Sequence, residues 1–118
     1  MTSLNRVILT GKVVTPPRRH YRPDGSPVIQ FPLELNDSEN LSGQVGRNRI
    51  NIVAVGKLAE FKLDLLQSGQ HLMVIGKLNQ RQWQTPEGKN RIRTEVIATD
   101  LRTIEEKNPT QNSKKQGE

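Results

Sequence analysis

The stretch Lys57–Gly69, "KLAEFKLDLLQSG", decides the fold of this chain, because it is where the hydrophobic period changes. Leu58, Phe61 and Leu65 recur at three- and four-residue spacing, which is typical of one face of an α-helix. Gly69 is well placed as the residue after a helix end, where a left-handed backbone is common. The spacing therefore predicts one short amphipathic helix with Phe61 in the core.

Three longer runs before this helix are typical of β-strands. Asn5–Val14, "NRVILTGKVV", is rich in β-branched residues, and Val28–Asn36, "VIQFPLELN", alternates apolar with polar residues. In the second run Phe31 belongs to the apolar face, whereas Pro32 indicates a bulge or an edge position because proline cannot donate to a ladder. Arg47–Gly56, "RNRINIVAVG", alternates in the same way. These runs predict three strands.

Polar segments separate or follow these runs. Arg18–Arg22, "RRHYR", is a short extended piece, and Pro23–Pro27, "PDGSP", is a strong turn signal. Asp37–Gly46 is polar and contains glycine, which indicates a mobile loop. Residues 105–118 lack aliphatic and aromatic side chains, so we expect a disordered polar tail after one domain over residues 1–104.

Two further strands are expected after the helix. His71–Trp83, "HLMVIGKLNQRQW", is a long run, Thr85–Asn90 is a hairpin turn, and Arg91–Leu101, "RIRTEVIATDL", returns. The order strand, strand, strand, helix, strand, strand is that of an OB-fold. This is a mainly β class in which five strands form a Greek-key barrel, here with one short helix between the third and fourth. The pattern gives the class but not the ligand, since the same barrel also holds oligosaccharides and protein partners.

The composition points to a polyanionic partner. The 118 residues carry 18 Lys and Arg against 12 Asp and Glu, a net charge of +6, and only 32% are hydrophobic. Such an excess favours nucleic acid or an anionic surface, although it also serves solubility. The N-terminus has no signal-peptide pattern, and no run approaches the roughly 18 apolar residues of a spanning helix. We therefore expect an intracellular protein that does not contact a membrane.

The alternation of side chains in the strands predicts a basic face with one indole. Lys77, Arg81 and Trp83 share one parity, and Arg91 and Arg93 share a face on the returning strand. This arrangement suits single-stranded nucleic acid, because a positive groove follows the phosphates while an indole stacks on a base. The candidate binding residues are Trp83, Arg81, Lys89, Arg91, Arg93, Lys77, Arg47, Arg49, Tyr21, Arg18 and Arg19.

Each candidate also has a purely structural interpretation. A barrel strand needs a solvated face, on which Lys and Arg are ordinary. Trp83 can pack across a hairpin onto its partner strand, and Tyr21 can cover an end of the barrel. On pattern alone, both interpretations stay open for both aromatic residues.

Catalysis finds little support in the sequence. With no cysteine, thiolate chemistry and Cys-based metal sites are excluded. His20 and His71 have no second His at ligand spacing, and the glycines form no phosphate-loop or dinucleotide fingerprint. We expect no enzyme activity, no metal and no cofactor.

The motifs resemble those of bacterial single-stranded DNA-binding proteins over about residues 4–102. "NRVILTG" fits N-x-V-x-L-x-G, and "YRPDG" fits a Y-x-P-(N/D)-G turn before an alternating strand. "VAVGKLAE" and "LLQSGQHLMVIGKLNQRQW" continue the resemblance through the helix and into the last hairpin. "TPPRRHYRPDGSPVIQFPLEL" is similar to the primosomal replication protein N group, a short branch of this family.

The resemblance implies an OB-fold that binds single-stranded DNA as a dimer or tetramer. Trp83 falls on the family's base-stacking aromatic of the fourth strand, with phosphate-contacting neighbours on the same hairpin. The family's other aromatics are missing, since residues near Glu39, Arg49 and Val55 occupy those places. The printed sequence ends "NSKKQGE" without the family's acidic tip.

We therefore expect a non-enzymatic accessory protein of replication, restart or recombination, rather than the main genome-coating protein, with replication or primosome proteins as partners. Its expected location is the cytoplasm at the nucleoid, or an organelle stroma if the gene is plastid-encoded. Two rival interpretations stay open. One is an RNA-binding OB module, and the other is a protein-interaction subunit that kept the barrel but binds DNA weakly or not at all.

Overall fold

Six strands and one short helix make up the computed structural model, which describes residues 3–35 and 48–104. The candidate Arg47, the expected loop 37–46 and the expected tail 105–118 lie outside the described residues. The elements are β1 (Val7–Val13), β2 (Arg18–Tyr21), β3 (Pro27–Leu35), β4 (Arg49–Val55), α1 (Gly56–Lys62), the 3₁₀ turn η1 (Leu63–Leu65), β5 (His71–Gln84) and β6 (Asn90–Thr103).

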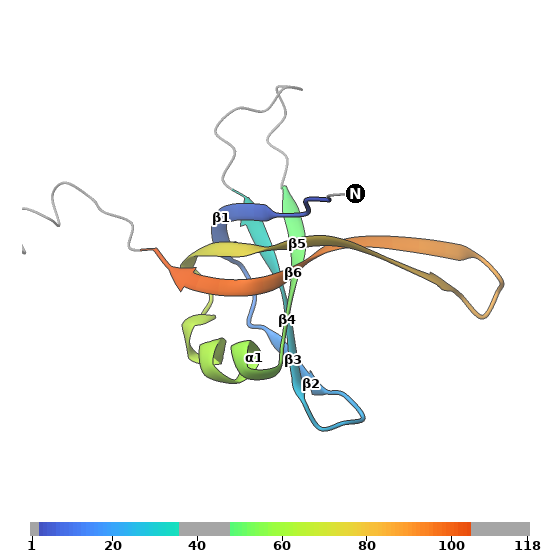
Figure 1. Ribbon diagram of the computed structural model, residues 1–118, viewed down its shortest axis with the longest axis horizontal. Helices are drawn as coiled ribbons and strands as arrows, with labels where there is room; N and C mark the ends of the chain where they lie inside the picture. The colour runs from blue at the N-terminus through green and yellow to red at the C-terminus, as the bar shows by residue number, and fades with distance from the viewer. Residues whose placement is uncertain (1–2, 36–47, 105–118) are drawn as a thin grey trace, which may run out of the picture.

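The strands close into a barrel (Figure 1). Their order is β1-β5-β6-β4-β3-β2, and β1 pairs with β3 as well as with β5, so that five strands form a ring. All pairings are antiparallel except β4 with β6, which run parallel. Counted within the ring, the helix lies between the third and fourth strands, which confirms the expected OB-fold class. The remaining strand, β2, lies outside the ring and is formed by the "RRHYR" segment. Among the described residues it pairs only with β3.

The core follows from the alternation of side chains. Ile29, Phe31 and Leu33 of β3 are buried, as the sequence pattern predicts. Facing side chains on the other strands complete the same cluster, and these are Val13, Ile52, Ala54, Leu72, Val74, Val96, Ala98 and Leu101. Pro32 interrupts neither the strand nor its pairing, since the register with β4 runs through Pro32 opposite Asn51. On the other side of β3, β2 pairs as far as Gln30 and β1 pairs from Leu33 onward. Among the described residues, no strand therefore pairs with Pro32 on that side.

The helix departs from the sequence prediction in length and orientation. It ends at Lys62 and gives way to η1, so Gly69 does not follow it directly. Gly69 has φ +90° and donates its N–H to the carbonyl oxygen of Val13 at 2.7 Å, at the turn into β5. Ala59 is the residue that α1 buries, whereas Phe61 is 71% exposed. Phe61 follows Ala59 by two residues, which corresponds to about 200° around a helix, so the two side chains point to opposite sides. The prediction of a buried Phe61 is therefore wrong.

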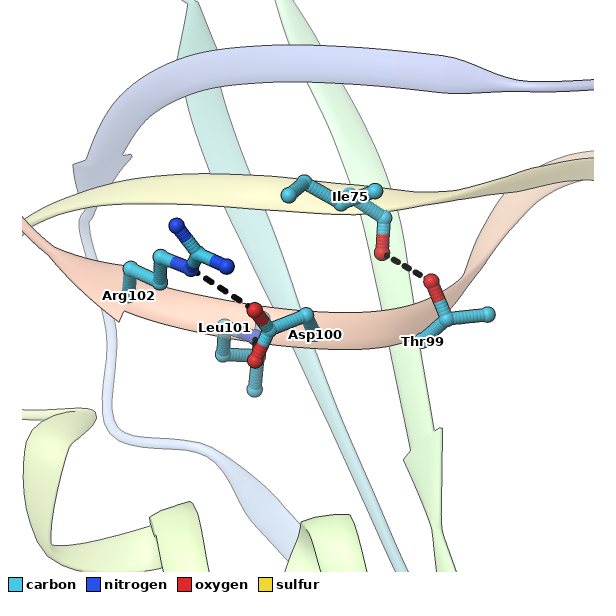
Figure 2. Close-up of polar contacts among 5 residues, drawn as sticks. All are labelled: Ile75, Thr99, Asp100, Leu101 and Arg102. Carbon is cyan, nitrogen blue, oxygen red and sulfur yellow. Dashed lines mark hydrogen bonds and ion pairs between the residues drawn. The ribbon is translucent and has the colours of Figure 1, made fainter.

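A bulge separates the two halves of the β5–β6 pair. Ile75 lies opposite Asp100 and Gly76 opposite Ala98, so Thr99 has no counterpart on β5. Thr99 Oγ1 instead donates to the carbonyl oxygen of Ile75 at 3.1 Å (Figure 2). A Cβ at Gly76 would clash with the backbone carbonyl oxygen of Ile97, so only glycine permits this close approach of the two strands.

Candidate nucleic-acid interface

Beyond the barrel, β5 and β6 continue as a two-stranded ribbon, here called the arm and comprising residues 77–94 (Figure 1). Every residue of the arm is exposed except Thr85, which is partly buried. Asn5 holds the root of the arm, because its side-chain amide donates to the carbonyl oxygen of Leu78 and accepts from the N–H of Leu78, both at 2.8 Å. The arm thus projects from a fixed base.

The turn at the end of the arm is closed by backbone hydrogen bonds. Thr85 N–H donates to the Lys89 carbonyl oxygen, and Gly88 N–H donates to the Thr85 carbonyl oxygen, each at 2.8 Å. Gly88 has φ +85°, a conformation that favours glycine. The expected hairpin turn is present, and it places Lys89 at the tip of the arm.

The register brings the basic candidates of the arm onto one face. Trp83 lies opposite Arg91, and Arg81 lies opposite Arg93. Residues directly opposite in an antiparallel pair project to the same side. We call Arg81, Arg91 and Arg93 the arginine cluster. The other face of the arm is uncharged and carries Leu78, Gln80, Gln82, Gln84, Asn90, Ile92 and Thr94.

The indole of Trp83 is neither sealed in the core nor fully free. It is 45% exposed, and the Arg81 Cζ lies 5.6 Å from the ring centroid, in the range of a cation–π contact. A hollow of about 440 Å³ adjoins it, lined by Gln82, Trp83, Gln84, Asn90, Arg91 and Ile92. The geometry therefore leaves the indole accessible to a flat ligand.

The basic face continues onto the outer surface of the barrel. Arg49 projects outward from β4, where its Nη2 lies 3.5 Å from Glu34 Oε2. This pair offsets part of the charge of Arg49. One row of cross-strand neighbours runs over five strands and consists of Arg18, Gln30, Val53, Ile97 and Lys77. Arg18 and Lys77 thus lie on one curved surface.

The alternation along β2 sends Arg19 and Tyr21 to the side opposite Arg18. Arg19 Cζ lies 5.9 Å from the centroid of the Tyr21 ring, and Tyr21 is exposed. Tyr21 is therefore not packed over the end of the barrel. The turn that follows is held by Asp24, which accepts from Ser26 Oγ at 2.6 Å and from Ser26 N–H at 2.9 Å. These bonds lower the pKa of Asp24 below 3.8.

A buried acid that the sequence did not single out lies at the root of the arm. Glu95 projects to the outer face of β6 yet is only 4% exposed. Its Oε1 lies 3.6 Å from Arg81 Nη2 and has no hydrogen-bond partner among the described residues. In the parallel register it lies opposite Asn51, whose Nδ2 is also buried and has no partner within residues 3–35 and 48–104. The shared parity of Glu95 with Arg91 and Arg93 was the available sequence signal.

Metal and membrane features are lacking in the part of the chain that the structure describes. Among residues 3–35 and 48–104, no three His, Asp or Glu side chains gather as metal ligands would. Over the same ranges, no helix has the length and apolar character needed to cross a membrane.

Comparison with known proteins gives the class of protein to which this fold belongs. A solved complex described as "Plasmodium falciparum SSB complex with ssDNA" superposes with a TM-score of 0.77 at 25% identity, covering 89% of this chain and 98% of that one. A structure of the single-stranded DNA binding protein from Thermus aquaticus gives 0.70 at 30% identity, covering 86% of this chain and 51% of that one.

The chain belongs to the single-strand binding protein family, whose profile matches residues 4–104. A single-stranded DNA-binding protein of Thermotoga maritima is 31% identical over 91% of this chain and 78% of its own length. A second, from Caldanaerobacter subterraneus, is 36% identical over 88% of this chain and 70% of its own. Membership confirms the resemblance drawn from the motifs and the expectation of a binding protein rather than an enzyme. It does not distinguish the short primosomal branch.

Proposed function

We propose that this protein binds single-stranded DNA along the arm and the adjoining outer surface of the barrel. The observation that carries the proposal is the half-exposed Trp83 among the arginine cluster, on a fold whose relatives are named single-stranded DNA-binding proteins. Unpaired bases have free faces that stack on an indole, whereas duplex bases do not. The site therefore favours single strands over duplex.

The proposed path of the strand follows the charges. Arg91, Arg93 and Arg81 contact phosphates on the arm, and Lys89 extends the track to its tip. Lys77, Arg49 and Arg18 continue it over the barrel, because they share the outer surface. Arg19 and Tyr21 form a second contact point on the other side of β2. Arg47 precedes β4 and is included on sequence grounds alone.

Self-association is part of the proposal. Within the described residues, Val7–Thr10 of β1 pair with β5 but have no strand on their other edge, since β3 pairs only with Gly11–Val13. Ile8 on this segment is exposed. An open strand edge with an apolar side chain is suited to pairing with the same edge of a second copy. A dimer or tetramer would join several basic surfaces into one track.

An accessory role, in replication restart or recombination, is also proposed, with replication or primosome proteins as partners. It is supported by the similarity of residues 15–35 to the primosomal replication protein N group and by the single Trp and single Tyr of the chain. With so few stacking residues, phosphate contacts must supply most of the affinity, and such binding is strongly salt-dependent.

The test is a titration of the intact protein with a dT oligonucleotide, a matched rU oligonucleotide and a duplex, at two ionic strengths. We expect quenching of Trp83 and tight binding of dT that weakens at higher salt. Preference for rU would favour the RNA-binding alternative. Unchanged anisotropy of every labelled oligonucleotide would refute nucleic-acid binding and favour the protein-interaction alternative.

A further inference from the structure

We propose that Glu95 is an internal counterion of the arginine cluster. Its carboxylate holds Arg81 beside Trp83 in the free protein and competes with phosphate for Arg81. The inference rests on the proposed function and identifies a residue that controls the affinity for single-stranded DNA. A carboxylate placed in this way lowers the affinity for single-stranded DNA. Its removal should therefore tighten binding.

The first argument is the environment of the carboxylate. Glu95 is almost completely buried, and in the part of the chain that the structure describes its Oε1 has no hydrogen-bond partner. A buried charged oxygen without a hydrogen bond is costly, so the carboxylate depends on an opposite charge close by. Arg81 Nη2, at 3.6 Å, is the cation that faces it. The distance is longer than that of a good charge-assisted hydrogen bond, so the pair is loose.

The second argument is the repulsion within the arginine cluster. Arg81 and Arg93 are directly opposite each other, and like charges in that position destabilise a strand pair. Glu95 lies two residues from Arg93 on the same face of β6. Its negative charge at the root of the arm therefore reduces the repulsion when no DNA is present. A phosphate would do the same when DNA is bound.

The third argument is access to the guanidinium. The Arg81 side chain is 50% exposed, so a phosphate can reach it without any opening of the barrel. As Arg81 turns toward a phosphate, it moves off the Trp83 ring and frees that side of the indole. Asn51 Nδ2, opposite Glu95 and buried without a partner among the residues described, is then the donor placed to bond to the carboxylate. Both unsatisfied polar atoms would thereby gain a partner.

The experiment compares Glu95→Gln with Asp100→Asn. Both variants raise the net charge by one, and both residues are on β6. Asp100 accepts from Arg102 Nε at 2.7 Å on the barrel side of the bulge, away from the arm (Figure 2). The readouts are the Kd for a dT oligonucleotide over a range of salt concentrations, the emission of Trp83 without DNA, and the midpoint of thermal unfolding.

We expect Glu95→Gln to bind roughly two- to fivefold more tightly, the range set by one loose ion pair. Its salt slope should steepen by up to about 0.7, because Arg81, no longer held by Glu95, neutralises a phosphate more fully and displaces the counterion of that phosphate. Asp100→Asn should change the affinity and the salt slope much less. The emission of Trp83 in the free protein should shift only in Glu95→Gln, since Arg81 is no longer held beside the ring.

A double variant shows whether Glu95 acts through Arg81. In an Arg81→Gln background, Glu95→Gln should leave the affinity unchanged. Weaker binding by Glu95→Gln at an unchanged unfolding midpoint would overturn the proposal, as would a response equal to that of Asp100→Asn. If Glu95→Gln fails to fold, Glu95→Asp, one methylene shorter, should show the same tighter binding.

The outcome for the proposed function is separate. If the unaltered protein does not bind dT, the proposed function fails, and with it the competition with phosphate. The emission of Trp83 in the DNA-free variants then still decides whether Glu95 holds Arg81 at the ring.

Discussion

The same two strands, β5 and β6, build two regions of opposite character. In the barrel they bury Leu72, Val74, Val96, Ala98 and Leu101 in the core, whereas along the arm no side chain is buried. A two-stranded ribbon alone is marginally stable in water, so the arm depends on the barrel to fix its base. The comparison teaches that one hairpin can supply core residues over one part of its length and an exposed basic surface over the other.

The largest expected effect is on the barrel. Phe31→Ala removes a fully buried ring and should lower the free energy of unfolding by about 3–5 kcal/mol. Ile92→Ala on the arm removes a side chain that is 61% exposed, and its effect should stay within about 0.5 kcal/mol. Urea denaturation of the two variants measures the contrast. Equal losses would mean that the arm contributes to the cooperative unit.

Trp83→Ala tests the arm, where we expect an effect on binding and not on stability. It should weaken binding of a dT oligonucleotide by roughly 1–3 kcal/mol, because one stacked base is lost, while the unfolding midpoint stays the same. Phe61→Ala is the matched control, since Phe61 is also an exposed aromatic but lies on α1. Fluorescence anisotropy of the labelled oligonucleotide gives both values. An equal loss in the control would remove stacking by Trp83 from the explanation.

The paired change Arg91→Ala with Arg93→Ala tests the charge of the arm. If each arginine neutralises one phosphate, the slope of log K against log salt should flatten by roughly 1.4 units. Lys57→Ala with Lys62→Ala removes the same charge from the helix region and should leave the slope nearly unchanged. A slope that flattens equally in both variants would show that net charge, and not the arm, governs binding.

The smallest effect concerns the β2–β3 turn. Because hydrogen bonds from Ser26 lower the pKa of Asp24 in the folded state, the ionised carboxylate stabilises the turn above pH 3.8. This contribution is lost as the pH falls through the lowered pKa. In Ser26→Ala the pKa of Asp24 should rise toward its ordinary value, which an NMR titration of the carboxyl carbon measures. An unchanged titration would assign the shift to another group.

Much of the barrel could be predicted because a strand pattern has period two. The ends of β3, β4 and β5 fall within a few residues of their predicted ends, and the alternation places Phe31 inside. The position of Phe61 could not be predicted, because it depends on where α1 stops and how it turns against the sheet. The "RRHYR" segment became a strand only through its pairing with β3.

The arrangement of the candidate interface could be predicted along each strand but not across strands. The shared face of Lys77, Arg81 and Trp83 follows from spacing alone, and the structure confirms it. The partners on β6 and β4 depend on register, which pairs segments far apart in the chain. For that reason the contacts of Arg49 with Glu34 and of Arg81 with Glu95 had no counterpart in the sequence prediction.

Thr99, the unpaired residue of the bulge, determines which face of the hairpin the odd- and even-numbered residues of β6 occupy. On its barrel side the even-numbered residues of β6, such as Asp100, share the outer surface, and on its arm side the odd-numbered ones do. Insertion of one residue between Thr99 and Arg93 would therefore move Arg91 and Arg93 to the face that carries the glutamines of β5, away from Arg81 and Trp83. Relatives that insert or delete residues of β6 between the bulge and the arginine cluster should do so in steps of two, or relocate the bulge, to keep the basic side chains on the same face.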